Sequence, residues 1–226
     1  NNKFFNSDYT PDENTKQEVE NLHKEGKSLS GAQLKYADMR GAQLVNADLS
    51  NADLTRADFS GSSLYGINLE GSNLFKANFE GANIKSANLK NCNILAADFT
   101  SAKLNNIDFG NNYKVINELQ AENAMDEGNK EIAIEKYKEA EDVYRNLKIN
   151  LQAQTLGEEV GKVFLREMIC KRKQLPLFSP IRIASKIAYI TTGYGEKIGN
   201  IVYTILCTLF ACAILYVLEG VSYGDK

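Results

Sequence analysis

The sequence of 226 residues has few of the side chains that catalytic and metal sites use. It contains one histidine, His23, and four cysteines, at positions 92, 170, 207 and 212, without paired spacing. A lone histidine with no cysteine or acidic ligand set near it makes neither a metal site nor an acid–base pair. Unpaired cysteines indicate a reducing context, and no glycine-rich phosphate loop is present. We therefore expect no enzyme activity, no cofactor, no metal site and no small-molecule substrate.

The sequence also lacks an excess of charge of one sign. It has 26 Lys and Arg against 29 Asp and Glu, which gives a net charge of −3. Proteins that bind the phosphates of nucleic acids carry a basic excess. We expect no nucleic-acid partner.

What the sequence does have is a five-residue period. From Leu29 to Phe109 every fifth residue is large and apolar, and the residue two places earlier is usually Ala or Ser. A period of five fits neither an α-helix nor an ordinary strand. Repetition at a fixed period is typical of a solenoid, whose turns must stack to bury their apolar faces.

The repeated pattern, as in SGAQLKYADMRGAQLVNADLSNADLTRADF at residues 30–59, resembles the pentapeptide-repeat family. The resemblance implies a right-handed quadrilateral β-helix with four pentapeptides in each coil. Residues twenty apart then stack in four inward columns, which are Leu34, Leu54, Leu74 and Ile94; Met39, Phe59, Phe79 and Phe99; Leu44, Leu64, Ile84 and Leu104; and Leu49, Leu69, Leu89 and Phe109. Ile67 and Ile107 stand where a small residue is expected and predict local bulging.

Both ends of such a solenoid are open sheet edges that need caps. Thr10 and Pro11 predict a helix start, with Glu13 closing a capping box, and Gly26 predicts the helix end. We expect residues 1–28 to form an N-terminal capping helix and residues 29–110 to form the pentapeptide-repeat solenoid.

After Phe109 the apolar period changes to 3.6 residues, which indicates α-helix. One helical face is predicted from Tyr137, Ala140, Tyr144, Leu147 and Leu151. A second amphipathic helix follows Gly157 and ends in Lys171, Arg172 and Lys173. An antiparallel helical hairpin over residues 111–175 is the simplest interpretation.

One long stretch without charge follows. Residues 198–218, IGNIVYTILCTLFACAILYVL, are long enough to cross the ~30 Å hydrocarbon core of a bilayer, and their position excludes a signal peptide. We expect a transmembrane helix over residues 197–219. The basic residues that precede it, Lys171, Arg172, Lys173, Arg182 and Lys186, place the solenoid on the cytoplasmic side.

Residues 176–196 are too short and too charged to cross a membrane. Pro176 and Pro180 open this segment, and its apolar face contains Ile183 and Ile187. We expect an interfacial amphipathic segment that contacts membrane lipid, with Arg182 and Lys186 toward the headgroups.

The five residues Thr191, Thr192, Gly193, Tyr194 and Gly195 resemble the filter of potassium channels, whose backbone carbonyls replace the hydration shell of the ion. A filter needs an outer helix before the pore helix, and residues 150–180 carry too many charges to supply one. In addition, Glu196 stands where the filter usually has Asp. We favour a hinge between a surface helix and a membrane helix over a conducting filter.

Two pairs of apolar residues occupy outward positions of the repeat. Phe75 and Leu95 lie on one face, and Val45 and Tyr65 lie on the opposite face. Exposed apolar pairs suggest contact surfaces. We expect one of two arrangements. Either the helix after Asn112 folds back over one of these pairs, or a partner protein or a second copy of the chain covers it.

The order of repeat, AEDVYRNLKIN, FLREMICKRK, GYGEK and apolar span resembles bacterial pentapeptide-repeat membrane proteins, some of which continue into an ion-channel pore. The resemblance implies a scaffold or regulatory subunit anchored in the bacterial inner membrane. One alternative is a channel subunit whose pore is not seen in this chain. Another is a DNA-mimicking topoisomerase inhibitor, which the near-neutral repeat disfavours.

Overall fold

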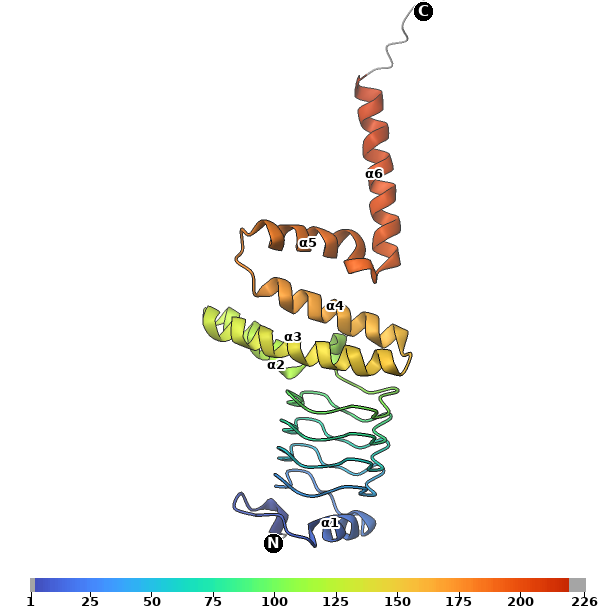
Figure 1. Cartoon of the computed structure of the whole chain (residues 1–226). Helices are drawn as coiled ribbons and strands as arrows, with labels where there is room; N and C mark the ends of the chain where they lie inside the picture. The colour runs from blue at the N-terminus through green and yellow to red at the C-terminus, as the bar shows by residue number, and fades with distance from the viewer. Residues whose placement is uncertain (1–2, 220–226) are drawn as a thin grey trace, which may run out of the picture. The chain divides into compact units, whose positions relative to one another are not determined.

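The computed structural model describes residues 3–219 and divides the chain into two compact units, Asn1–Gln174 and Leu175–Lys226 (Figure 1). The first unit contains a short N-terminal segment, the solenoid and three α-helices. The second contains two α-helices joined by a single 3-10 turn.

The solenoid has a coil of twenty residues. Isolated parallel bridges join residues twenty apart, from Gln33 with Asp53 to Asn88 with Asp108, and they recur at every fifth residue. Within residues 3–219 the coils pair through these single bridges, and no continuous strand forms. Four ladders of bridges therefore run up the solenoid, one for each pentapeptide of the coil.

Each ladder belongs to one of the four predicted columns, and we number the faces accordingly. Face 1 is built on Leu34, face 2 on Met39, face 3 on Leu44 and face 4 on Leu49, with the residues twenty, forty and sixty positions further on. All four columns are buried. On face 2, Phe79 stacks between Phe59 and Phe99 with ring centroids 5.5 and 5.4 Å apart.

The bulge expected at Ile67 is absent. Ile67 is fully buried, and the bridges between Asp48 and Asn68 and between Asn68 and Asn88 continue past it. The residues above and below Ile67 in its column are Ala47 and Ala87, so a large side chain alternates with small ones and fits without displacing the backbone.

Aspartates before the core residues hold the turns. Asp58 Oδ1 accepts a hydrogen bond from the backbone N–H of Ser60 (2.9 Å), and Asp53 Oδ1 accepts one from Thr55 (3.0 Å). Short polar side chains commonly bond to the backbone two residues on in this way. These carboxylates are structural.

The N-terminal segment comprises a 3-10 turn, η1 (Lys3–Phe5), and the helix α1 (Thr15–Lys24). The start predicted at Thr10 and Pro11 is wrong, because α1 begins at Thr15. The side chains of Asp12 and Thr15 bond to each other, and Thr15 Oγ1 also accepts from the backbone N–H of Asp12 (2.7 Å). This local turn delays the helix.

After the solenoid come η2 (Asn111–Tyr113), α2 (Ile116–Asp126), α3 (Lys130–Ala153) and α4 (Gly157–Lys173). The region predicted as a hairpin thus contains three helices, and α3 packs against both α2 and α4. Helix α2 escapes prediction because its buried residues include the polar Asn117 and Glu118, which break the apolar pattern.

The second unit consists of α5 (Pro180–Thr192), η3 (Gly193–Gly195) and α6 (Ile198–Glu219). Within the described residues, the stretch Ile198–Val217 is the one helix that is long and apolar enough to cross a membrane. Its mean hydropathy is 2.1, and none of it is buried.

Candidate interaction surface

The lower edge of the solenoid is closed by the N-terminal segment. The backbone N–H of Gln33 donates to Phe4 O (2.7 Å), and that of Gln43 donates to Glu20 Oε1 (2.9 Å). Lys16 Nζ donates to Arg40 O (3.0 Å), and His23 Nε2 lies 3.0 Å from Val45 O. His23 therefore belongs to a cap.

The upper edge is closed by side-chain amides of α3 and of its C-cap residue, Gln154. Gln154 Nε2 donates to Ala102 O (2.7 Å), while Gln154 Oε1 accepts from the backbone N–H of Leu104 (2.9 Å). Asn146 Nδ2 donates to Ala97 O (3.2 Å). Gln154 thus pairs with the last coil as a further strand would. Sequence reasoning missed these residues, although amides at positions 146, 150 and 154 follow one helix face.

A buried ion pair fixes the three helices to one another. Glu118 on α2 is fully buried and pairs with Arg166 on α4, whose Nε lies 3.0 Å from Glu118 Oε2. The Tyr144 hydroxyl on α3 donates to the same oxygen (2.7 Å) and accepts from the backbone N–H of Val115 (2.9 Å). Burial, with the charge of Glu118 second, raises the pKa of Tyr144. The hydroxyl therefore stays a donor.

A groove of about 710 Å³ lies between the last coil and α3. Residues 96–101 of the coil form one wall, and Arg145, Ile149 and Asn150 of α3 lie on the other. Next to it lies a hollow of about 200 Å³, which is lined by Leu95 of the last coil and by Val143 and Leu147 of α3.

The predicted outward residues have different surroundings. Leu95 is half-buried beside α3, and Phe75 is half-buried with the Lys76 ammonium 5.2 Å from its ring centroid. Val45 and Tyr65 on face 3 remain 40% and 46% exposed.

No metal or nucleophile site comes together in the described part of the chain. Across residues 3–219, no group of three or more His, Cys, Asp or Glu residues is placed to hold a metal ion. Cys92 and Cys170 are buried, and burial raises the pKa of the Cys92 thiol to about 12, which keeps it protonated. Cys207 and Cys212 are exposed on α6.

The filter-like residues Thr191–Gly195 form the elbow between α5 and α6. Ile190 O accepts from Asn200 Nδ2 (3.0 Å), and Thr191 O accepts from Thr204 Oγ1 (2.9 Å). The carbonyl of Thr192 accepts from the backbone N–H of Lys197 (3.2 Å). The carbonyls of Thr191 and Thr192 thus bond within the chain, whereas those of a filter would face an ion.

The predicted membrane-facing bases fall in both units. Lys171, Arg172 and Lys173 form the last turn of α4 in the first unit. Arg182 and Lys186 lie on α5 in the second unit, one helical turn apart, and Arg182 donates to the carbonyl of Leu175. Helix α5 exposes isoleucines at positions 181, 183, 187 and 190, as an amphipathic surface helix does.

Comparison with known proteins identifies the repeat. A family model described as pentapeptide repeats, with eight copies, matches residues 25–51 and 52–91. A search of curated proteins gave no match.

Solved structures of pentapeptide-repeat proteins resemble parts of the chain. One is alr5209 from Nostoc Pcc 7120, 27% identical over 46% of this chain and 89% of that one, with a TM-score of 0.38. Another is HetL from Nostoc sp. strain PCC 7120, involved in heterocyst differentiation regulation, 39% identical over 35% of each chain, with a TM-score of 0.27. A third is QnrB1, a plasmid-mediated fluoroquinolone resistance protein, 23% identical over 37% of this chain and 58% of that one, with a TM-score of 0.27.

Proposed function

Because residues 25–51 and 52–91 match the family model of pentapeptide repeats, we propose that this chain is a protein-interaction scaffold anchored to a membrane. The closure of both solenoid edges carries this proposal. Gln43 and Leu104, at opposite ends, already bond to side chains of the capping helices. A partner therefore meets the side faces of a rigid solenoid and does not extend it by adding a strand.

We further propose that the solenoid is a right-handed quadrilateral β-helix without enzymatic activity. The coil of twenty residues and the four ladders of bridges support the four-sided form. The handedness follows from the family resemblance. In this form the outward side chains of each face make a flat, hydrogen-bonded wall, which suits binding rather than catalysis.

Anchoring is proposed from the second unit. Helix α6 is apolar and unburied, and the elbow bonds from Asn200 and Thr204 tie it to the amphipathic α5. A helix that lies in the interface and one that crosses the core would meet at such an elbow. The basic residues on the N-terminal side of α6 support, by the positive-inside rule, a solenoid in the cytoplasm of a bacterium, with the anchor in the inner membrane.

Membrane fractionation of the full chain tests this function. We expect the protein in the membrane fraction, resistant to carbonate and released by detergent. The double variant Leu206→Lys with Leu209→Lys should become soluble, because charges at the centre of a bilayer are costly. A matched variant on the surface helix, Ser185→Lys, should stay with the membrane. A wild-type chain that is soluble without detergent would overturn the anchoring.

A channel subunit remains the competing function, and the elbow bonds count against a filter at Thr191–Gly195. Purified full chain in planar bilayers should give no potassium conductance. Selective conductance that is lost in Tyr194→Ala would overturn the hinge interpretation in favour of the filter.

A further inference from the structure

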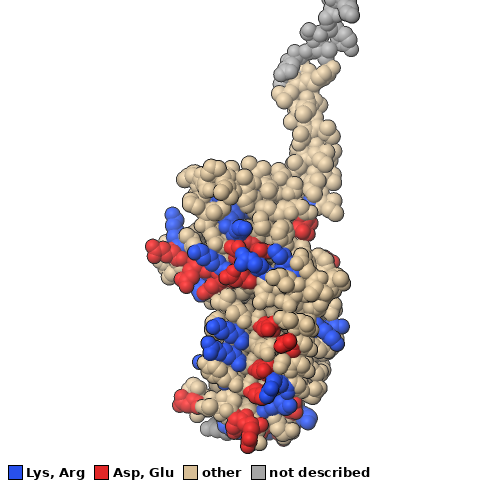
Figure 2. Space-filling model, in the orientation of Figure 1, with Lys and Arg blue, Asp and Glu red and all other residues tan. Residues whose placement is uncertain are grey.

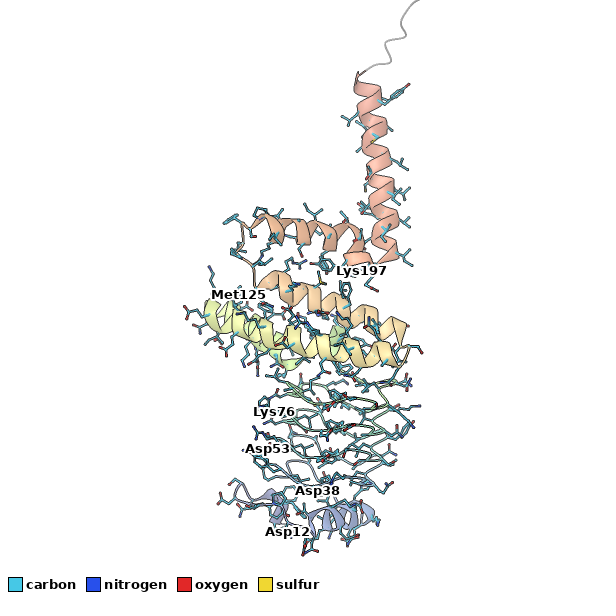
Figure 3. All side chains as sticks on the ribbon, in the orientation of Figure 1. Asp12, Asp38, Asp53, Lys76, Met125 and Lys197 are labelled. Atoms are coloured by element: carbon cyan, nitrogen blue, oxygen red, sulfur yellow. The ribbon has the colours of Figure 1, made fainter. Side chains whose placement is uncertain are left out.

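Charge on the solenoid is sorted by face, and faces 1 and 3 are basic. The charged side chains are Lys35, Asp53, Arg56 and Lys76 on face 1; Asp38, Arg40, Asp58, Glu80 and Asp98 on face 2; Lys85 and Lys103 on face 3; and Asp48, Glu70, Lys90 and Asp108 on face 4. The net charges of faces 1 to 4 are therefore +2, −3, +2 and −2. Figure 2 shows Lys and Arg gathered on the flank from which Lys76 points in Figure 3. A partner that carries carboxylates would be attracted to one of the two basic faces.

The backbone distinguishes face 1 from face 3. From Gly31 to Asn106, the second outward residue of every pentapeptide has a positive φ, a conformation that favours Gly and Asn. Faces 2, 3 and 4 have only Gly, Asn or Ser at this position. Face 1 instead has Tyr36 (φ 64°), Arg56 (φ 56°) and Lys76 (φ 58°). Gly or Asn would relieve this backbone strain, and strain that is retained in this way is typical of functional sites.

The cations of face 1 are held by aromatic rings and not by carboxylates. The Arg56 guanidinium carbon lies 5.8 Å from the centroid of the Tyr36 ring, and Lys35 Nζ lies 5.4 Å from the same centroid. One coil further up, Lys76 Nζ lies 5.2 Å from the centroid of the Phe75 ring. Among residues 3–219, no carboxylate forms an ion pair with any of these three cations. Ring contacts therefore hold the cations near the face while their charge stays available to a partner.

The upper end of face 1 is apolar. Leu95 stands one coil above Phe75, and the hollow of about 200 Å³ separates it from Val143 and Leu147 of α3. Figure 1 shows α3 reaching past the flank on which Lys76 lies in Figure 3. A cavity of about 150 Å³ accepts benzene, so this hollow has room for one apolar side chain. Face 1 thus presents cations on three coils and an apolar recess on the fourth.

The spacing of these four levels favours an α-helix over an extended chain. Successive coils rise about 4.8 Å, so the levels lie at about 0, 4.8, 9.6 and 14.4 Å along the coil axis. Residues i, i+3, i+7 and i+10 of a helix lie on one side of it, at about 0, 4.5, 10.5 and 15 Å. Residues on one side of an extended chain are about 6.7 Å apart, so the fourth would miss its level by about 6 Å. The helix keeps all four within about 1 Å.

We propose that face 1 binds an acidic helix of a partner protein, which lies along the coil axis. Three carboxylates on one side of this helix pair with Lys35, Arg56 and Lys76. An apolar side chain at the end of the same row enters the hollow beside Leu95. Either direction of the helix satisfies the pattern, because the gaps of three, four and three residues are symmetric. The inference rests on the proposed scaffold function and states which face is used and what chemistry the partner has.

Stapled helical peptides and the detergent-solubilised full chain test this contact by fluorescence anisotropy. Two peptides carry glutamate at three of the positions i, i+3, i+7 and i+10, with leucine at the last position in one and at the first in the other. We expect one of them to bind, and more weakly as the salt concentration rises. Arg56→Glu should weaken binding about tenfold or more, because it turns the central attraction into repulsion. Lys85→Glu makes a matching charge reversal on the other basic face and should change binding less than about twofold.

The strained backbone gives a second readout. Lys76→Gly removes a cation and also the side chain that disfavours positive φ. It should therefore weaken peptide binding while it raises the urea concentration at the midpoint of unfolding. Ser86→Gly changes the matching position of face 3, so it should also raise the midpoint but leave binding unchanged.

The opposite results are equally specific. A wild type that binds neither peptide would overturn the acidic helix as the occupant. An equal loss in Arg56→Glu and Lys85→Glu would overturn the assignment to face 1. An isomer with the same glutamates at every second position and proline between them cannot form a helix, and its equal binding would overturn the helical form.

Two further measurements separate this contact from other properties of the chain. Self-association of the wild type that is lost in Arg56→Glu and is not competed by the peptides would assign face 1 to a second copy and overturn the proposal. A chain found outside the membrane fraction would overturn the anchoring alone, since none of these contacts involves the second unit.

Discussion

The two ends of the solenoid are closed by caps of different size, and the larger cap is the one from which the chain continues. At the N-terminal end one helix of ten residues, α1, contributes Glu20, Lys16 and His23 to the first coil. At the C-terminal end α3 contributes amides to the last coil, and α2 and α4 hold it through a buried ion pair. A few hydrogen bonds suffice to close an edge. The cap from which the chain continues into the second unit has a core of its own.

The largest effect should come from breaking the buried pair of the C-terminal cap. Arg166→Met leaves the Glu118 carboxylate buried without its cation, which typically costs about 3–5 kcal/mol. We expect the three helices to unfold at a lower urea concentration than the solenoid. Far-ultraviolet circular dichroism at the helix band measures this. Lys162→Met, on the same helix but exposed, should change stability by less than about 0.5 kcal/mol. Equal effects of the two variants would contradict the role of the pair.

A smaller loss is expected where the same cap meets the coil. Gln154→Leu removes both hydrogen bonds to Ala102 and Leu104 and leaves those backbone groups unpaired. We expect the free energy of unfolding to fall by about 2 kcal/mol. Hydrogen exchange of the Leu104 amide should accelerate. Gln152→Leu makes the same change at an exposed position of α3 and should leave that amide protected. Protection unchanged in Gln154→Leu would show that the amide does not close the edge.

The N-terminal cap should respond less. Glu20→Ala removes one acceptor, that of the Gln43 backbone N–H, so we expect about 1–2 kcal/mol and faster exchange of that amide. Glu20→Gln retains a carbonyl oxygen at the same place and should recover most of the loss. Should Glu20→Ala prove as costly as Arg166→Met, the contrast between the two ends would fail.

The smallest effect concerns an exposed pair beside this cap. Hydrogen bonds from Arg40 lower the pKa of Asp38 to about 2. Because the folded pKa is depressed, the contribution is present above the ordinary value of 3.8 and is lost as the pH falls toward 2. In Arg40→Ala the Asp38 pKa, followed by carboxyl resonances in NMR, should rise toward 3.8. Thermal stability at neutral pH should hardly change, since exposed pairs contribute little. A pKa that stays near 2 would assign the shift to the backbone instead.

The coil could be predicted from the sequence because every pentapeptide carries the same information. One misplaced residue, such as Ile67, cannot disturb a period that seventeen apolar positions share. The caps lack this redundancy. Helix α1 starts late because of a single contact between Asp12 and Thr15, and α2 is hidden because Glu118 is buried by a partner 48 residues away.

The candidate contact surface was partly visible in the sequence. The outward positions of Val45 and Tyr65 follow from the register. The net charge of the whole repeat is near zero because the charges of its four faces alternate in sign, so this sum hides the charge of each face. Arranging the charged residues in rows of twenty would have separated them. The edge-closing role of Gln154 depends on where α3 lies, which no local pattern encodes.

Because parallel bridges pair residues twenty apart, the length of the solenoid fixes the direction in which α2, α3 and α4 leave its last coil. Loss of one pentapeptide would turn α3 by a quarter of a revolution about the coil axis, while loss of twenty residues would shorten the solenoid and keep the same heading. The length of the solenoid and the direction of these helices can therefore change independently. Adding or removing whole coils of twenty residues changes the length alone, whereas adding or removing one to three pentapeptides also turns α2, α3 and α4 about the coil axis.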